Sequence, residues 1–150
     1  MEDQRPDSRG PPVSAAFVVD CSVAMAWLFH DEATPKTADL LNRLANETAL
    51  VPAWWFIEIA NVLAMAERKG RITAAQTDAF IADLEKLGIE RDHAAPDRAF
   101  THLLALCRVH SLISYDAMYL DLAVRRNLPL ATLDEDLRKI AKKLGVSLLG

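Results

Sequence analysis

Short apolar runs alternate along the chain with longer segments of helical periodicity. The runs fall at residues 16–20, 49–51, 88–90, 128–133 and 146–149. A short apolar run that contains β-branched residues is typical of a buried strand. Strands that alternate with helices predict a parallel sheet with helices on both faces. The sequence therefore predicts a single α/β domain with a central, mainly parallel sheet.

Capping and stop signals indicate where the helices begin and end. Thr34 is expected to be a helix N-cap, with Pro35 at the first helical position. Thr73 and Gln76 have the spacing of a capping box. The longest helix is expected to begin at Pro52 and to stop at Gly70. Because this helix is apolar on nearly all sides, we expect it to be buried. Further helices are expected over residues 22–29, 97–109, 114–126 and 134–145.

The length of 150 residues suits one domain with a substantial core. Residues 1–15 begin with a polar, proline-rich segment that lacks the apolar stretch of a secretory signal. We expect them to form a flexible tail before a domain at 16–150. No apolar run is long enough to span a membrane. Two cysteines in apolar surroundings, Cys21 and Cys107, are expected to be reduced, as in a cytoplasmic protein.

Four acidic residues lie in sequence that otherwise indicates a core. They are Asp20, Glu58, Asp116 and Asp134. A buried carboxylate is costly unless it is paired or binds a metal, and no basic partner is evident in the neighbouring sequence. Carboxylates without histidine or thiolate partners favour Mg²⁺ or Mn²⁺ over zinc. The set therefore predicts a site for a hard divalent cation.

Each acid also has a simpler interpretation, which the sequence leaves open. Asp20 and Asp134 each follow a strand and precede a helix, so either side chain could be a helix N-cap. Asp116 is expected in the first turn of a helix, where a negative charge complements the helix dipole. Glu58 could be a surface residue near the start of its helix. The coincidence of all four favours the cation site.

Three polar residues accompany the acids. Asn61 follows Glu58 by three positions and should share its helix face. Ser22 comes shortly after the first strand and Thr132 lies near the end of the fourth. Hydroxyl groups in such places can orient a carboxylate or a bound water.

The net charge of −4 predicts no general attraction to nucleic acid. Basic residues are nevertheless grouped in two stretches of the chain, and either a solvated helix face or a rim that contacts phosphates would explain them. The candidate RNA contacts are Arg68, Lys69, Arg125, Arg126 and Lys139.

Four segments carry a resemblance to a known family. VVDCSV at 18–23, PAWWFIEIANVL at 52–63, SYDAMYLDLA at 114–123 and LATLDEDL at 130–137 resemble, in this order, the motifs of PIN-domain ribonucleases. The resemblance is to the VapC-type toxins of bacterial toxin–antitoxin pairs and covers about residues 16–150. It implies a PIN-like fold for that domain.

The resemblance implies a Mg²⁺- or Mn²⁺-dependent endoribonuclease that hydrolyses RNA with water activated by the cation. The four acids would form the catalytic, metal-binding cluster, with Ser22, Asn61 and Thr132 as their polar neighbours. Asp136 would be a further candidate ligand. The implied partners are the RNA substrate, a cognate VapB-type antitoxin and a second copy of the chain in a homodimer.

Other classes of α/β protein fit less well. A phosphate-receiver module needs a second acid close to the first, and a dehalogenase-type phosphatase needs Asp-x-Asp at the first strand. The chain has Asp20-Cys21-Ser22 there. The remaining alternative is a catalytically weak PIN-like module that only binds a partner, and the presence of all four acids disfavours it.

Overall fold

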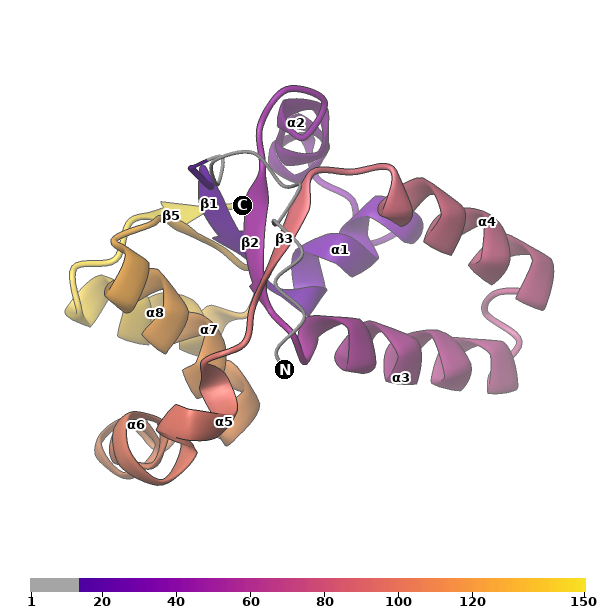
Figure 1. Cartoon of the computed structure of the whole chain (residues 1–150). Helices are drawn as coiled ribbons and strands as arrows, with labels where there is room; N and C mark the ends of the chain where they lie inside the picture. The colour runs from indigo at the N-terminus through magenta and orange to yellow at the C-terminus, as the bar shows by residue number, and fades with distance from the viewer. Residues whose placement is uncertain (1–13) are drawn as a thin grey trace, which may run out of the picture.

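The structure is a computed structural model in which residues 14–150 are described. Five strands form one sheet in the order β3-β2-β1-β4-β5, and every neighbouring pair is parallel (Figure 1). The strands are β1 (Phe17–Val19), β2 (Ala49–Pro52), β3 (Ile89–Asp92), β4 (Leu130–Ala131) and β5 (Leu148–Leu149). The prediction of one α/β sheet is confirmed, and the sheet is parallel throughout.

Helices connect these strands and surround the sheet. They are α1 (Cys21–Leu28), α2 (Pro35–Arg43), α3 (Trp55–Arg68), α4 (Ala74–Glu85), α5 (Ala95–Arg98), the π-helical turn η1 (Ala99–Leu103), α6 (Leu104–His110), α7 (Ser114–Arg126) and α8 (Glu135–Lys143). Figure 1 shows α1 to α4 on one side of the sheet and α5 to α8 on the other. Right-handed crossovers require this division, because the chain first moves from β1 toward β3 and then from β4 toward β5.

The core lies where the three central strands meet the helices on both faces. Phe17, Val18 and Val19 of β1 are fully buried, as is Leu130 of β4. Val18 is paired with Leu50 on one side and with Leu130 on the other. A strand covered on both faces must be apolar at every position, which explains why it was recognisable as a continuous run.

The long third helix differs from its prediction in two ways. Pro52 ends β2, paired with Asp92 of β3, and the helix begins only at Trp55. A proline can end a strand because no further ladder hydrogen bond is required there. The expectation that this helix is buried on all sides was wrong, since Ile57 is 55% and Met65 is 42% exposed.

The first described residues are already part of the folded domain. Ala15 is buried, and the backbone N–H of Ala16 donates to the carbonyl of Thr48. The greater part of the predicted tail, residues 1–13, lies outside the described residues. Within residues 14–150, none of the helices has the length and apolar character needed to cross a membrane.

Candidate active site

The topology brings two of the predicted acids to one place. From β1 the chain moves toward one edge of the sheet, and from the neighbouring β4 it moves toward the other edge. In open parallel sheets, ligands bind at the carboxyl ends of the two strands where the direction of winding reverses. Asp20 directly follows β1, and Asp134 comes three residues after the end of β4. The reversal point of this sheet therefore carries both acids.

Asp20 is held by hydroxyl groups from two distant segments. Its side chain is 5% exposed and belongs to the N-cap residue of α1. Ser22 Oγ donates to its Oδ1 at 2.6 Å, and Thr132 Oγ1 donates to its Oδ2 at 2.5 Å. Burial raises the pKa of Asp20, while these hydrogen bonds, with one from the Val23 N–H, offset part of the rise. The carboxylate is thus oriented without being neutralised.

The same two hydroxyls tie the end of β4 to the start of α1. The N–H of Leu133 donates to Ser22 Oγ at 2.9 Å, and the N–H of Asp134 donates to Thr132 Oγ1 at 3.1 Å. Asp134 is the N-cap of α8, and its Oδ1 accepts from the Leu137 N–H at 2.8 Å. The helix-cap interpretation of Asp134 is therefore correct as a local role, and its second carboxylate oxygen has no partner among the described residues.

Glu58 lies in the first turn of α3, the helix that follows β2. Its Oε1 accepts a hydrogen bond from the hydroxyl of Tyr119 at 3.1 Å. Burial raises the pKa of Glu58, and the negative charges of Asp20 and Asp116 raise it further, against the lowering effect of the Tyr119 hydrogen bond. The hydrogen bond to Tyr119 joins Glu58 to α7, the helix that carries Asp116.

Asp116 lies in the first turn of α7 and is half-buried. Burial, together with the negative charges of Asp134, Asp20 and Asp136, raises the pKa of Asp116 to about 6. A carboxylate at the N-terminus of a helix would ordinarily be favoured in its charged form. The raised pKa therefore indicates that burial and repulsion from the other acids outweigh the helix dipole.

Two further acids, the buried Asp121 and the partly buried Asp92, have cationic partners. Arg98 donates to both oxygens of Asp121, at 2.6 and 2.8 Å, and Arg125 donates to both oxygens of Asp92, at 3.1 and 2.8 Å. Although burial disfavours the charged form, the Arg125 hydrogen bonds lower the pKa of Asp92. The two ion pairs are structural: Arg98–Asp121 joins α5 to α7, and Arg125–Asp92 joins α7 to β3.

The contrast between the two sets of acids is informative. Within residues 14–150, no lysine, arginine or histidine lies within ion-pair distance of Asp20, Glu58 or Asp116. Negative charge that burial penalises, and that the protein leaves uncompensated, is an expected signature of a functional site. The structural acids show the opposite pattern.

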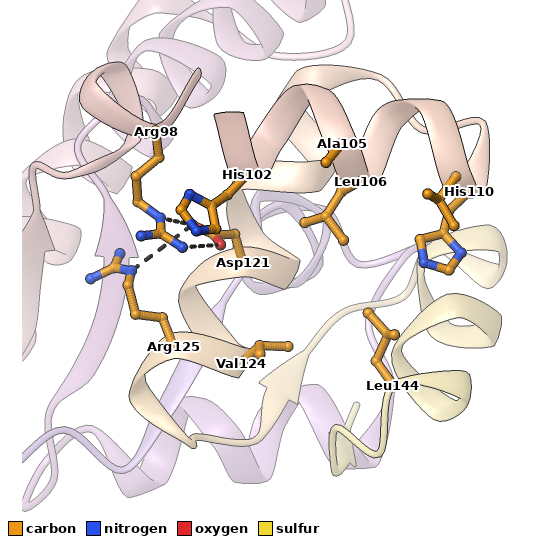
Figure 2. Close-up of a pocket in the computed structure, with 10 residues that line it drawn as sticks. Arg98, His102, Ala105, Leu106, His110, Asp121, Val124, Arg125 and Leu144 are labelled. Carbon is orange, nitrogen blue, oxygen red and sulfur yellow. Dashed lines mark hydrogen bonds and ion pairs between the residues drawn. The ribbon is translucent and has the colours of Figure 1, made fainter. Parts of the chain in front are cut away.

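A cavity of about 480 Å³ lies beside the structural ion pairs rather than beside the uncompensated acids. Figure 2 shows Arg98, Asp121 and Arg125 meeting at one end of it, with Leu106 and Leu144 farther along its wall. None of the four predicted acids lines this cavity. We therefore place the candidate active site at the strand ends and not here.

The other predicted site residues fall into separate places. Asn61 is exposed on α3 and donates to the sulfur of Met65, and in the described chain it makes no hydrogen bond to the acids. Arg125, a predicted RNA contact, is engaged by Asp92, and its side chain is 25% exposed. The remaining candidate RNA contacts are exposed: Arg68, Lys69, Arg126 and Lys139. Asp136 is also exposed, in the first turn of α8.

Tyr119 is the residue that the sequence analysis missed. It is 2% exposed, and in the sequence it stands in the apolar stretch of SYDAMYLDLA, where an aromatic residue indicates core packing. Its distance of 61 residues from Glu58 gave no local signal of the hydrogen bond between them.

The donor atoms fit a hard divalent cation in kind. All are carboxylate oxygens, which Mg²⁺ and Mn²⁺ prefer, and the acids raise one another's pKa as charges near each other do. In the part of the chain that the structure describes, no three histidine, cysteine or acidic side chains already form a cluster that could hold a metal ion. The acids therefore match a divalent cation in the type of donor atom and in their electrostatic coupling, but they do not form a complete coordination shell.

Comparison with known proteins identifies the family of the chain. The family model for the PIN domain matches residues 17–143, so the chain belongs to the PIN domain family. PIN domains are generally metal-dependent nucleases, and they usually bind divalent metal ions. The family assignment therefore supports a hydrolase in broad terms.

One solved structure similar to this chain is the crystal structure of PAE2754 from Pyrobaculum aerophilum. The two share 23% sequence identity with a TM-score of 0.65, over 89% of this chain and 83% of the other. At this identity the likeness shows a shared fold. The curated proteins include no significant match to the chain.

The raised pKa of Asp116 predicts an unusual pH dependence of the metal-free protein. Between its ordinary value of 3.8 and about 6, the folded state holds this proton more tightly than the unfolded state does. Stability should therefore fall as pH rises through this window, by about 1 kcal/mol after allowance for solvent screening. Urea unfolding with a chelator present, at intervals from pH 4 to pH 7, measures it. A slope in this window that is equally steep in Asp116→Asn would contradict the assignment.

Proposed function

We propose that this protein is a Mg²⁺- or Mn²⁺-dependent endoribonuclease, the toxin of a type II toxin–antitoxin pair. The observation that carries the proposal is a set of acids, electrostatically coupled to one another, that have no cationic partner within the described chain. Asp20, Glu58 and Asp116 have raised pKa values, and Asp134 lies beside them in a PIN domain. A stable monomeric fold gains nothing from this repulsion, so a cation-dependent function accounts for it.

Asp20, Glu58, Asp116 and Asp134 would hold the cation, with Ser22 and Thr132 orienting Asp20. When bound, a divalent cation acidifies a water molecule and neutralises charge on a phosphoryl group. Side-chain rotation would have to complete the cluster, because the acids are not yet gathered around one point. Asp134 is exposed, and its movement would have to preserve or replace the cap hydrogen bond from the Leu137 N–H to Oδ1.

The proposed partners follow from the family resemblance. RNA would approach over the exposed basic residues Arg68, Lys69, Arg126 and Lys139, whose phosphate contacts would be independent of sequence. A cognate VapB-type antitoxin and a second copy of the chain would each need an apolar surface. Trp54, the N-cap residue of α3, is 41% exposed, and Ile57 within α3 is 55% exposed, which supports contact with another protein. A cytoplasmic location agrees with these partners.

Cleavage of total RNA tests the proposal. The wild-type protein should cut RNA with Mn²⁺ present and leave it intact with a chelator, and the new ends should carry a 5′-phosphate. Asp20→Asn is a suitable inactive control, because asparagine also caps helices well and α1 should persist. RNA that stays intact with wild type and Mn²⁺ would favour the alternative, a catalytically weak PIN-like module that binds a partner.

Binding of the cation should also stabilise the fold. A ligand at about 100 times its dissociation constant stabilises the folded state by about 2.7 kcal/mol. For a domain of this size, that corresponds to a rise in melting temperature of roughly 5–10 °C. Thermal unfolding across a Mn²⁺ titration measures it, with Ca²⁺-free buffer and a chelator as the baseline. A melting curve that does not move with Mn²⁺ would count against the site.

A further inference from the structure

The buried and partly buried acids of this protein are held in two chemically different ways. Asp92 and Asp121 receive bidentate hydrogen bonds from arginine. Asp20 and Glu58 receive hydrogen bonds only from hydroxyl groups and backbone amides, as far as the described chain shows. A guanidinium neutralises the carboxylate that it orients, whereas a neutral hydroxyl orients a carboxylate and leaves its charge available to a cation.

Tyr119 is the only hydroxyl of this kind that reaches Glu58 among the described residues. Its ring is buried in the main core, and its helix, α7, packs against β1 and β2. The hydroxyl crosses from α7 to α3 to reach Oε1 of Glu58 at 3.1 Å. The phenolic O–H is the donor in this contact and the carboxylate oxygen is the acceptor. A rigid ring thus presents a permanent donor to a flexible side chain.

Glu58 has particular need of such a partner. Its side chain has more rotatable bonds than that of Asp20, and it is only partly buried. One hydrogen bond to Oε1 selects a rotamer, and the other oxygen and the remaining lone pairs of Oε1 stay open for a cation. Without that hydrogen bond, the entropy cost of ordering the Glu58 side chain would reduce the free energy of cation binding.

We propose that Tyr119 is a positioning residue, which holds the Glu58 carboxylate in the orientation that binds the divalent cation. The inference rests on the proposed function, because it gives Glu58 the role of a cation ligand. Tyr119 itself touches neither the cation nor the RNA. It acts through Glu58 alone.

The test compares Mn²⁺ affinity by isothermal titration calorimetry in the wild type and in Tyr119→Phe. The substitution keeps the ring and removes only the hydroxyl, and loss of such an orienting partner typically weakens metal affinity 10- to 100-fold. We expect about a tenfold weaker Mn²⁺ dissociation constant. Tyr115→Phe is the matched control on the same helix, since Tyr115 is 54% exposed, and it should bind Mn²⁺ as the wild type does. Unchanged affinity in Tyr119→Phe would overturn the proposal.

A double-mutant cycle with Glu58→Gln separates positioning from general damage to the fold. If Tyr119 acts through Glu58, the hydroxyl has nothing to orient once the carboxylate is gone, and Tyr119→Phe should then have no further effect. An equal loss of affinity in both backgrounds would overturn the proposal. If Glu58→Gln alone binds Mn²⁺ as tightly as the wild type, the proposed cation site itself fails. If Glu58→Gln weakens binding and Tyr119→Phe does not, only the present inference fails.

Discussion

Replacing Asp116 by asparagine should abolish RNA cleavage and leave the metal-free fold at least as stable as the wild type. The amide has nearly the same shape as the carboxyl group but carries no charge to bind a cation. We expect cleavage to fall by more than about a hundredfold, which exceeds the usual effect of losing an orienting partner of a metal ligand. The measurement is the initial rate of cleavage of labelled RNA at saturating Mn²⁺.

The stability of this variant follows from the same electrostatics. Asp116 has a pKa of about 6 because of burial and the charges of Asp134, Asp20 and Asp136. Relief of that penalty is worth about 1 kcal/mol once solvent screening is included, and the lost helix-dipole interaction offsets roughly 0.3–1 kcal/mol of it. The metal-free melting temperature should therefore stay constant or rise by a few degrees.

Asp121→Asn is the matched control, because Asp121 lies on the same helix and is also buried. Its carboxylate is paired with Arg98, and its loss would leave a partly buried guanidinium without its partner. We expect this variant to melt at clearly lower temperature. If Asp116→Asn were destabilised as much as Asp121→Asn, Asp116 would be a structural residue and its place in the cation site would be refuted.

Replacing Arg125 by methionine should destabilise the protein by about 2–4 kcal/mol. Arg125 donates to both oxygens of Asp92, whose side chain is 10% exposed, and its Nε lies 3.9 Å from Asp121. Removing Arg125 takes both short hydrogen bonds from the carboxylate of Asp92 and leaves it the more distant, exposed Arg126, and loss of one member of a largely buried pair is the costly case. Urea unfolding at pH 7 in the presence of a chelator measures the loss in free energy of unfolding.

Arg126→Met is the control for this substitution. Arg126 is exposed, and its guanidinium lies 3.8 Å from Asp92, a geometry worth less than about 1 kcal/mol.

The pKa of Asp92 is lowered, so its ion pair stabilises the fold at pH values above the ordinary pKa of 3.8. The loss in free energy of unfolding caused by Arg125→Met should therefore become smaller below about pH 4. Equal stabilities of the two variants would show that the pair is not structural. RNA cleavage by folded Arg125→Met at low temperature would separate this role from the predicted RNA contact.

The acids could be located in the sequence because each interrupts an apolar run. Asp20 ends the residues that form β1, and an acid at such a position is conspicuous without any knowledge of the fold. Ser22 and Thr132 were predicted to accompany the acids, and both donate to Asp20. These contacts depend on the pairing of β1 with β4, which the structure shows and which the sequence analysis did not predict.

Other features depended on which side of an element faces the core. Asn61 was predicted to accompany Glu58 from its spacing, yet the helix is exposed on the side that carries Asn61. The prediction that α3 is buried failed because an apolar helix surface is buried only where another element covers it. Ile57 and Met65 remain exposed in the described structure. Tyr119 was missed because a tyrosine in an apolar stretch indicates core packing. Nothing in the sequence indicated that its hydroxyl donates to Glu58.

Local sequence was sufficient to locate the strands, the helix caps at Thr34 and Thr73 and the acids that interrupt apolar runs, because periodicity and burial cost act over a few residues. Only the tertiary structure decided which acids would be neutralised. Asp92 and Asp121 meet arginines from other elements, while Asp20, Glu58 and Asp116 meet hydroxyls and one another. The physical reason is that the free energy of a charge depends on what lies within a few ångströms in space, wherever in the chain those neighbours come from.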